Sequence, residues 1–235
     1  MVKKRRFEKI SCHHCEVSHL CLGKRADEAY MDYLDNVIEY VKLYEPGEHL
    51  FLEHDPIDKI FAVFQGACKD YWINEHGHHQ VNEFYLPGDI IGLELLQKGA
   101  ATINAVAIKP SLICVIPFNS KQADLQQNLA FKEKLLHTLC RKIENQCHYV
   151  TSTNAKSRVA SFFLNLIHRL QERCKNYHDY VLPMTNLEIS SKLGLANETL
   201  SRILSEFHKK SLLVIQQKKI VHADLEGLKL MMFHS

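Results

Sequence analysis

The sequence comprises 235 residues, of which 46% are hydrophobic and 24% are charged, an ordinary composition for a globular protein. The mean hydropathy is −0.20, and no apolar run approaches the ~20 residues of a membrane-spanning helix. The basic start, MVKKRRFEKI, leads into a segment rich in cysteine and histidine rather than into the apolar core of a secretion signal. We therefore expect a cytoplasmic protein with no membrane partner. The net charge of +2 is too small to indicate nucleic-acid binding by itself.

Three of the eight cysteines lie close together near the N-terminus: Cys12, Cys15 and Cys21 form the pattern C-x2-C-x5-C. Closely spaced cysteines in a chain without an export signal are typical of metal ligands rather than disulfides. The pattern alone fits zinc and iron–sulfur about equally, and the histidines between the cysteines slightly favour zinc. A site made only of cysteines needs a fourth thiolate, which the spacing does not identify.

Glycine and proline are concentrated between positions 46 and 117, which hold six of the nine glycines and five of the six prolines. Short runs with high β-propensity alternate there with turn residues, and this pattern predicts a β-sandwich or β-roll. The runs are Ile60–Phe64, Tyr71–Ile73, Val81–Leu86 and Leu112–Ile116. Residues 118–182 contain neither glycine nor proline, so long helices are expected there.

An apolar stripe runs through this glycine-free region with spacings of 4, 3, 4 and 3 residues. Its members are Leu136, Cys140, Ile143, Cys147 and Val150. The 3.5-residue period and the flanking charges favour a coiled-coil seam, and hence a homodimer. The alternative is a helix that packs only on its own domain. On either interpretation, Cys140 and Cys147 are expected to be small buried apolar residues.

A helix-turn-helix is predicted from Thr185, where the chain reads TNLEISSKLGLANETLSRILSEFHKKSLL. Thr185 and Glu188 have the spacing of a capping box, and Gly194 is placed to end the first helix. A second helix is expected after a break at residues 195–197. Its apolar positions follow helical spacing: Leu200, Ile203, Leu204 and Phe207.

The second helix would present Glu198, Ser201 and Arg202 to the base edges of double-stranded DNA, for which these residue types are suited. Residues 212–215 and 219–222 read as a hairpin, or wing, beside it. Four lysines are expected to contact phosphates: Lys209, Lys210, Lys218 and Lys219. The alternative is an ordinary helical hairpin with a solvated charged face.

Four segments, CHHCEVSHLC, NEFYLPGD (82–89), PSLICVIPF and ETLSR, together resemble the FNR branch of the CRP/FNR transcription regulators, the oxygen-sensing relatives of the cyclic-AMP receptor protein. The resemblance spans nearly the whole chain and implies an α+β fold in four parts. These are a cysteine-rich cluster-binding segment (1–28), a β-roll like that of cyclic-nucleotide-binding domains (29–124), a dimerisation helix (125–153) and a C-terminal winged helix-turn-helix (154–235).

The resemblance also implies a [4Fe–4S] cluster whose ligands are Cys12, Cys15, Cys21 and Cys114. It matches Glu198, Ser201 and Arg202 to the family's E-x-x-S-R element, which contacts the bases of a palindromic TTGAT-type site. Residues 82–89 resemble the patch with which relatives contact RNA polymerase, so activation is expected, with repression at some sites equally allowed. The main alternative keeps the DNA-binding domain and replaces the cluster with zinc or a thiol-redox site.

Two other functions are disfavoured by the sequence. No arginine lies between Arg25 and Arg141, so the roll lacks the residue that normally binds the phosphate of a cyclic nucleotide. The pattern His76-x-His78-x4-Glu83 is similar to a cupin metal motif, but Gly77 between the histidines predicts a hairpin turn there. We therefore expect neither a bound cyclic nucleotide nor an enzyme.

Overall fold

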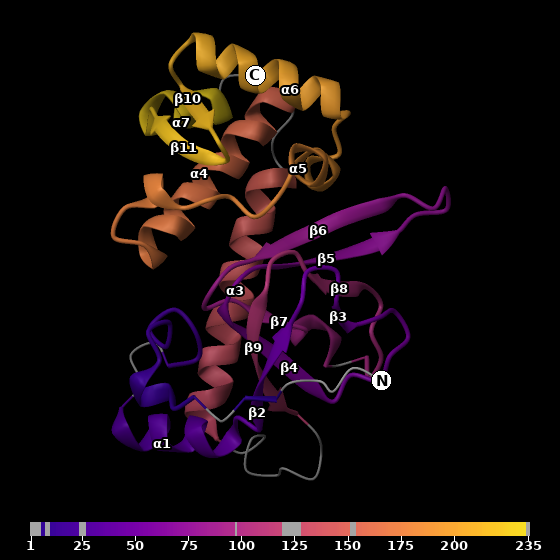
Figure 1. Ribbon diagram of the computed structural model, residues 1–235, viewed down its shortest axis with the longest axis vertical. Coiled ribbons are helices and arrows are strands. Elements are labelled where there is room, and N and C mark those ends of the chain that lie inside the picture. The colour runs from indigo at the N-terminus through magenta and orange to yellow at the C-terminus, as the bar shows by residue number, and fades with distance from the viewer. Residues whose placement is uncertain are drawn as a thin grey trace. The chain divides into compact units, whose positions relative to one another are not determined.

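The computed structural model describes residues 6–7, 10–23, 27–96, 98–118, 128–150 and 154–233. The chain forms two compact units, residues 1–140 and 141–235 (Figure 1). Within the described ranges, no helix combines the length and the apolar character needed to cross a membrane.

The first unit is built on two antiparallel sheets, as the β-roll prediction requires. One sheet has the order β1 (Arg6–Phe7), β2 (Tyr40–Tyr44), β9 (Ser111–Pro117), β4 (Lys59–Gln65), β7 (Ile90–Ile91). The other has the order β3 (His49–Phe51), β8 (Asn104–Ala107), β5 (Cys68–Ile73), β6 (His79–Tyr85). All four β-prone runs are confirmed as strand, in β4, β5, β6 and β9, except that Leu86 lies just past the end of β6.

The five-stranded sheet has an apolar core on each face. Between the sheets, Phe61 and Val115 pack with Tyr85 and the small residue Ala105. On the opposite face, residues such as Ile116 pack against two helices and the cysteine-rich segment. Side chains that alternate along β9 therefore point into the roll interior and into a second core on the other face of the sheet.

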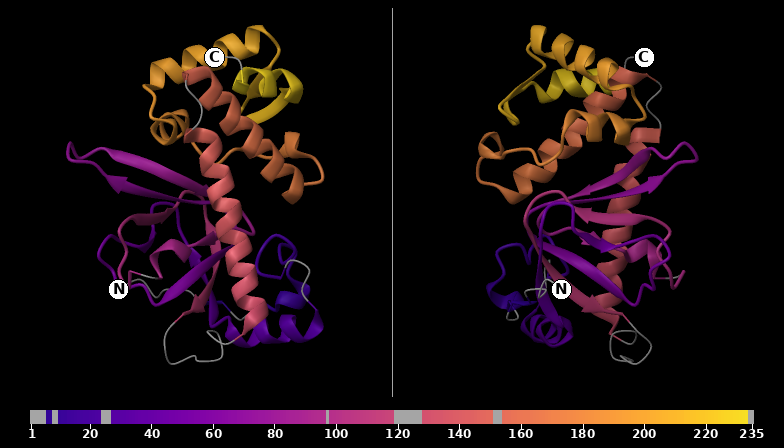
Figure 2. Two further views of the ribbon diagram at one scale, coloured as in Figure 1. Left: turned by 180° about the vertical axis from the view of Figure 1, so that it is seen from behind. Right: turned by 45° about the vertical axis from the view of Figure 1, so that its right-hand side comes forward.

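The helices on that second face are α1 (Glu28–Val37) and the beginning of α3 (Leu129–Val150). Figure 2 shows α1 crossing the N-terminal end of α3. The contact is aromatic, with the rings of Tyr33 and Phe131 meeting edge to face at 6.2 Å. Two short 3-10 helices complete the unit, η1 (Cys12–His14) and η2 (Leu93–Leu95). Helix α1 has no counterpart among the sequence predictions.

The seam positions of α3 that the structure describes are exposed. Leu136 and Ile143 are 62% and 59% exposed, and Cys140 is also exposed, whereas Phe131 on the roll side is buried. Cys140 is thus not buried within the single chain, because it lies on the open side of the helix. The side chains of Cys147 and Val150 lie outside the described residues, as do residues 119–127 and 151–153 of the predicted helix and its flanks.

The second unit contains the predicted winged helix-turn-helix. Its elements are α4 (Ala155–Arg173), η3 (Tyr177–Asp179), α5 (Asn186–Leu193), α6 (Asn197–Lys209), β10 (Leu213–Gln216), β11 (Lys219–Ala223) and α7 (Leu225–Phe233). The capping box of Thr185 and Glu188 is confirmed, and Gly194 ends α5 in the left-handed conformation, with φ of 62°. Helix α6 begins at Asn197, within the expected break, and buries Leu200, Ile203 and Phe207.

Candidate cysteine site and nucleic-acid interface

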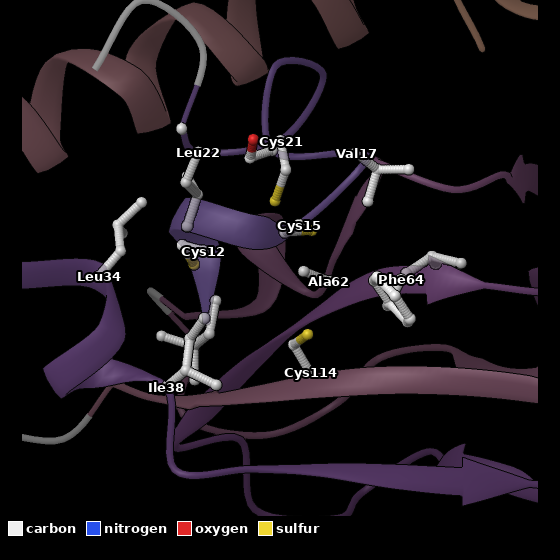
Figure 3. A pocket seen from close by; sticks show the side chains of 14 residues that line it. Cys12, Cys15, Val17, Cys21, Leu22, Leu34, Ile38, Ala62, Phe64 and Cys114 are labelled. Atoms are coloured by element: carbon white, nitrogen blue, oxygen red, sulfur yellow. The ribbon is translucent and has the colours of Figure 1, made fainter. Parts of the chain in front are cut away.

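The four cysteines singled out by the resemblance line one pocket (Figure 3). Cys12 begins η1, Cys15 follows η1, and Cys21 lies in the turn that precedes α1. Cys114 lies in the middle of β9 and points its sulfur toward the N-terminal segment (Figure 3). The rest of the lining is mainly apolar and includes Leu22, Leu34, Ile38, Phe64 and Ile116.

Helix α1 holds the first cysteine in place through two carboxylates. Asp35 accepts hydrogen bonds from the Ser11 hydroxyl at 2.6 Å and from the Cys12 amide. One turn earlier, Asp32 pairs with His13 Nε2 at 2.9 Å. These contacts satisfy donors at the start of η1, whose three residues bury none of their own side chains. Sequence reasoning missed both carboxylates, because nothing local links α1 to the cysteine segment.

Gly88 provides the third support of the segment, from the turn between β6 and β7. Its φ of +91° is one that glycine adopts readily, and a Cβ built there would lie 2.5 Å from Leu20 Cβ. Leu20 is itself buried, one residue before Cys21. The close approach of the Gly88 backbone therefore seats the segment against the roll.

Burial governs the protonation of the four thiols. Desolvation raises the pKa of Cys21 and Cys114 to about 12 and also raises the pKa of Cys12 and Cys15. The thiolate charges raise one another's pKa further, with Cys114 acting on Cys21 and Cys12 acting on Cys114. Without a metal, the group should remain protonated at neutral pH, and metal binding would have to displace the protons.

The four cysteine side chains are suitable ligands for a metal group that binds thiolates. Four sulfurs from two distant parts of the chain line the pocket, and no histidine does so among the described residues. In the same described part, no three or more His, Cys, Asp or Glu side chains are already gathered at metal-ligand spacing. Assembly would therefore have to draw the sulfurs together. Two cysteines outside the pocket differ in burial: Cys68 is buried and Cys174 is half-buried.

The apolar interior of the roll contains a buried carboxylate. Asp70 is fully buried between the sheets and accepts hydrogen bonds from the Tyr85 hydroxyl at 2.8 Å and the Glu83 amide at 2.7 Å. Burial, followed by the charges of Asp70, Glu94 and Glu83, raises the pKa of Tyr85 well above its ordinary value. An anionic cyclic nucleotide would meet this carboxyl group without the usual arginine.

The histidines of the cupin-like pattern lie in the tip of a hairpin, as predicted. The side chain of Asn74 accepts from the amides of His76 and His78 at 3.0 and 2.9 Å, and Gly77 has φ of +76°. This is a local turn motif between β5 and β6.

Helix α6 presents the predicted DNA-reading residues on one exposed side. Glu198, Ser201 and Arg202 are all exposed, while the opposite side is buried against the domain. Of the predicted phosphate-binding lysines, Lys209, Lys210 and Lys218 are exposed, and Lys219 is half-buried. The exposed polar face and buried apolar stripe are the arrangement that sets a recognition helix into the major groove.

An ion-pair group that sequence reasoning missed lies beside this face. Glu206 Oε2 is 2.7 Å from Lys156 Nζ on α4, and Glu206 Oε1 is 2.9 Å from Lys210 Nζ. Hydrogen bonds from Lys156 and Lys210 lower the pKa of Glu206 to about 2. Lys210 therefore forms an ion pair within the protein, whereas the sequence predicts only a contact between this lysine and a phosphate.

The wing is confirmed as a hairpin. Strand β10 lies one residue later than expected, and β11 begins at Lys219 as expected and ends one residue later. Its two-residue turn places Gln217 and Lys218 at φ of 48° and 62°. These left-handed angles match a type I′ turn, which usually contains asparagine and glycine. The turn presents Lys218 at the tip of the wing.

Comparison with known proteins identifies both units. Residues 41–128 match the cyclic nucleotide-binding domain model, and residues 157–231 match the Crp-like helix-turn-helix model. The chain is 33% identical to the anaerobic regulatory protein of Haemophilus influenzae over 93% of this chain and 86% of that protein. It is 31% identical to the fumarate and nitrate reduction regulatory protein of Escherichia coli over 96% of this chain and 92% of that protein.

The chain belongs to the FNR branch of the CRP/FNR family. Members of this family are transcription regulators rather than enzymes, and this regulator carries their helix-turn-helix DNA-binding domain. The fold agrees: FixK2 from Bradyrhizobium japonicum superimposes with a TM-score of 0.70 and 24% identity, over 83% of this chain and 98% of that one. The FNR-like α+β architecture predicted from the sequence is thereby confirmed.

Proposed function

We propose that this FNR-family regulator is cytoplasmic, responds to oxygen and binds a palindromic TTGAT-type DNA site as a homodimer. Cys12, Cys15, Cys21 and Cys114 are the proposed ligands of a [4Fe–4S] cluster. The observation that carries the proposal is the convergence of these cysteines, three from the N-terminal segment and one from β9, on a single pocket. When bound, the cluster would supply an oxygen-labile cross-link between that segment and the roll.

Helix α1 is the proposed link from the cysteines to the dimer helix. Asp35 holds the Cys12 amide, and on the same helix Tyr33 contacts Phe131 at the start of α3. Leu34 and Phe131 also share one apolar core. Loosening the cysteine segment would remove the contacts that hold α1, and through it would disturb the packing of α3. Such a two-state element can transmit a ligand's state to a distant surface.

The apolar stripe of α3 is the proposed dimer seam, formed by Leu136, Cys140, Ile143, Cys147 and Val150. An Ile143→Asp variant should sediment as a monomer, because two carboxylates would face each other at the seam. Lys142→Asp introduces the same side chain beside the seam and should leave the dimer intact. A dimer that survives Ile143→Asp unchanged would contradict this seam.

The dimer would place two α6 helices in successive major grooves, about 34–36 Å apart. Glu198, Ser201 and Arg202 would read bases, while Lys209, Lys210 and Lys218 would contact phosphates. To contact a phosphate, Lys210 would have to break its ion pair with Glu206 or bind both groups at once. Residues 82–89, in β6 and the following turn, are the proposed contact with RNA polymerase for activation.

The cofactor is tested by anaerobic purification with iron and sulfide assays. We expect broad absorption near ~400 nm, its loss in Cys114→Ser, and its retention in Cys68→Ser. Cys68 is the matched control because it is also buried in the roll but does not line the pocket. Colourless protein with stoichiometric zinc would contradict the proposal in favour of a zinc site.

A further inference from the structure

Tyr30 carries a buried hydroxyl that the surrounding residues leave unpaired. The residue is 6% exposed and lies on α1, one turn before Leu34, which lines the cysteine pocket. Its hydroxyl has no hydrogen-bond partner among the described residues. Burying a hydroxyl without a partner is unfavourable, so such a group points to a partner that arrives on binding.

The surroundings of Tyr30 indicate what that partner is. Its ring stacks on Tyr33 at 5.9 Å, and it shares an apolar core with Leu22 and Leu34. After burial and Tyr33, the thiolate charges of Cys21 and Cys12 are the causes that raise its pKa. Cys12 and Cys21 pack against this same core, so the phenol lies close to two proposed ligands. It stays protonated and can act as a hydrogen-bond donor.

We propose that the Tyr30 hydroxyl donates a hydrogen bond to a cysteine sulfur of the bound cluster, with Cys21 the stronger candidate. This inference rests on the proposed function and makes Tyr30 a positioning residue of the same site. Hydrogen bonds to the sulfurs of iron–sulfur clusters help set their reduction potential. A donor stabilises the more negative, reduced state, so Tyr30 should slow the loss of the cluster in air.

The opposite influence comes from Glu16, whose negative charge acts on Cys15. A carboxylate there should favour the oxidised, less negative state. Tyr30 and Glu16 would thus change the oxygen sensitivity of the cluster in opposite directions. The hydroxyl can be removed without changing the ring, which makes the Tyr30 effect separable from packing.

The test compares wild type, Tyr30→Phe and the control Tyr33→Phe, each reconstituted anaerobically with ferrous iron and sulfide. In air, the ~400 nm absorbance of Tyr30→Phe should decay about tenfold faster than that of wild type, the factor expected for a lost hydrogen bond to a charged group. Tyr33→Phe should decay at the wild-type rate. The Fe–S stretching bands should shift on transfer to D2O in wild type and in Tyr33→Phe. The shift should be smaller in Tyr30→Phe, where only the backbone amides that donate to Cys15 and Cys21 remain.

The cluster-free proteins give an independent measurement. Apo Tyr30→Phe should melt at or above the wild-type temperature, because the variant loses only an unpaired buried hydroxyl. A clearly lower melting temperature would mean that the hydroxyl is already bonded, and would overturn the inference. Equal decay rates with an unchanged D2O shift would overturn it while leaving the proposed function intact. Wild-type protein that takes up no iron and sulfide would overturn both.

Discussion

The cysteine-rich segment and the helix-turn-helix are held in place by different means. Helix α6 buries Leu200, Ile203 and Phe207 in its own domain, and a complete capping box starts α5. The cysteine segment has a three-residue helix without buried side chains, and it depends on contacts from α1 and from Gly88. The helix-turn-helix is thus supported from within its own domain, whereas the cysteine segment, the proposed sensor, depends on contacts from outside it. Elements that must respond to a signal are drawn from the less stable parts of a fold.

The largest effect is expected in the core of the DNA-binding unit. Phe207→Ala removes a fully buried ring and should destabilise that unit by about 3–5 kcal/mol. DNA binding should be lost in both anaerobic and aerated samples, while iron content stays at the wild-type level. Chemical denaturation followed by circular dichroism, with an iron assay, checks both halves of the prediction. Loss of iron in this variant would show that the two regions are not separately supported.

Asp35→Ala should have the next largest effect, this time on the cysteine segment. It removes the acceptor of two hydrogen bonds and should favour local opening of residues 10–23 by about 1–3 kcal/mol. Faster amide exchange in those residues of the apo protein is the measurement. Asn36→Ala is the matched control, because Asn36 is exposed on the same helix and its replacement should leave the exchange unchanged. Equal exchange in Asp35→Ala and wild type would contradict the role of α1.

Gly88→Ala tests the other support of the segment. The substitution strains a left-handed residue by about 1–2 kcal/mol and forces Leu20 to move, so the Cys21 thiol should react faster with an alkylating reagent in the apo protein. Gly77→Ala is the matched control, since Gly77 has a similar φ but no atom of the described residues lies within 4 Å of the added Cβ. Identical alkylation of the two variants would count against the seating of Leu20 on Gly88.

The smallest effect concerns Glu206 and acid. Its pKa is lowered to about 2 in the folded protein, below the ordinary 4.5, so its contribution to stability is present above pH 4.5 and is lost as the pH falls toward 2. Glu206→Gln should therefore narrow the stability difference between pH 6 and pH 3. Because the Glu206 side chain is only partly buried, the change should be small and should fade at high salt. Melting curves at the two pH values measure it, and an unchanged difference would contradict the pairing.

Local signals made the DNA-binding unit predictable. Thr185, Glu188 and Gly194 act on their own neighbours, so their spacing alone placed the first helix of the motif and its end. The β-prone runs likewise became strands. The wing turn was located, although Gln217 and Lys218 are not the residues usual for its conformation.

The cysteine site was less predictable because it is assembled by long-range contacts. Spacing found Cys12, Cys15 and Cys21, but only resemblance selected Cys114 from the remaining cysteines. Nothing in the sequence pairs Asp35 with the Cys12 amide, or brings Tyr30 near the thiols. These contacts depend on α1 lying across the second core, and no local pattern reveals that placement.

The most direct test of the account is the affinity of one anaerobic sample for a palindromic TTGAT-type duplex, measured before and after exposure to air together with its iron content. The account predicts that the Kd rises by about 10- to 100-fold as the iron is lost, the range of a typical coupling between two sites. An iron-free protein that binds the same duplex as tightly as the anaerobic sample would contradict it.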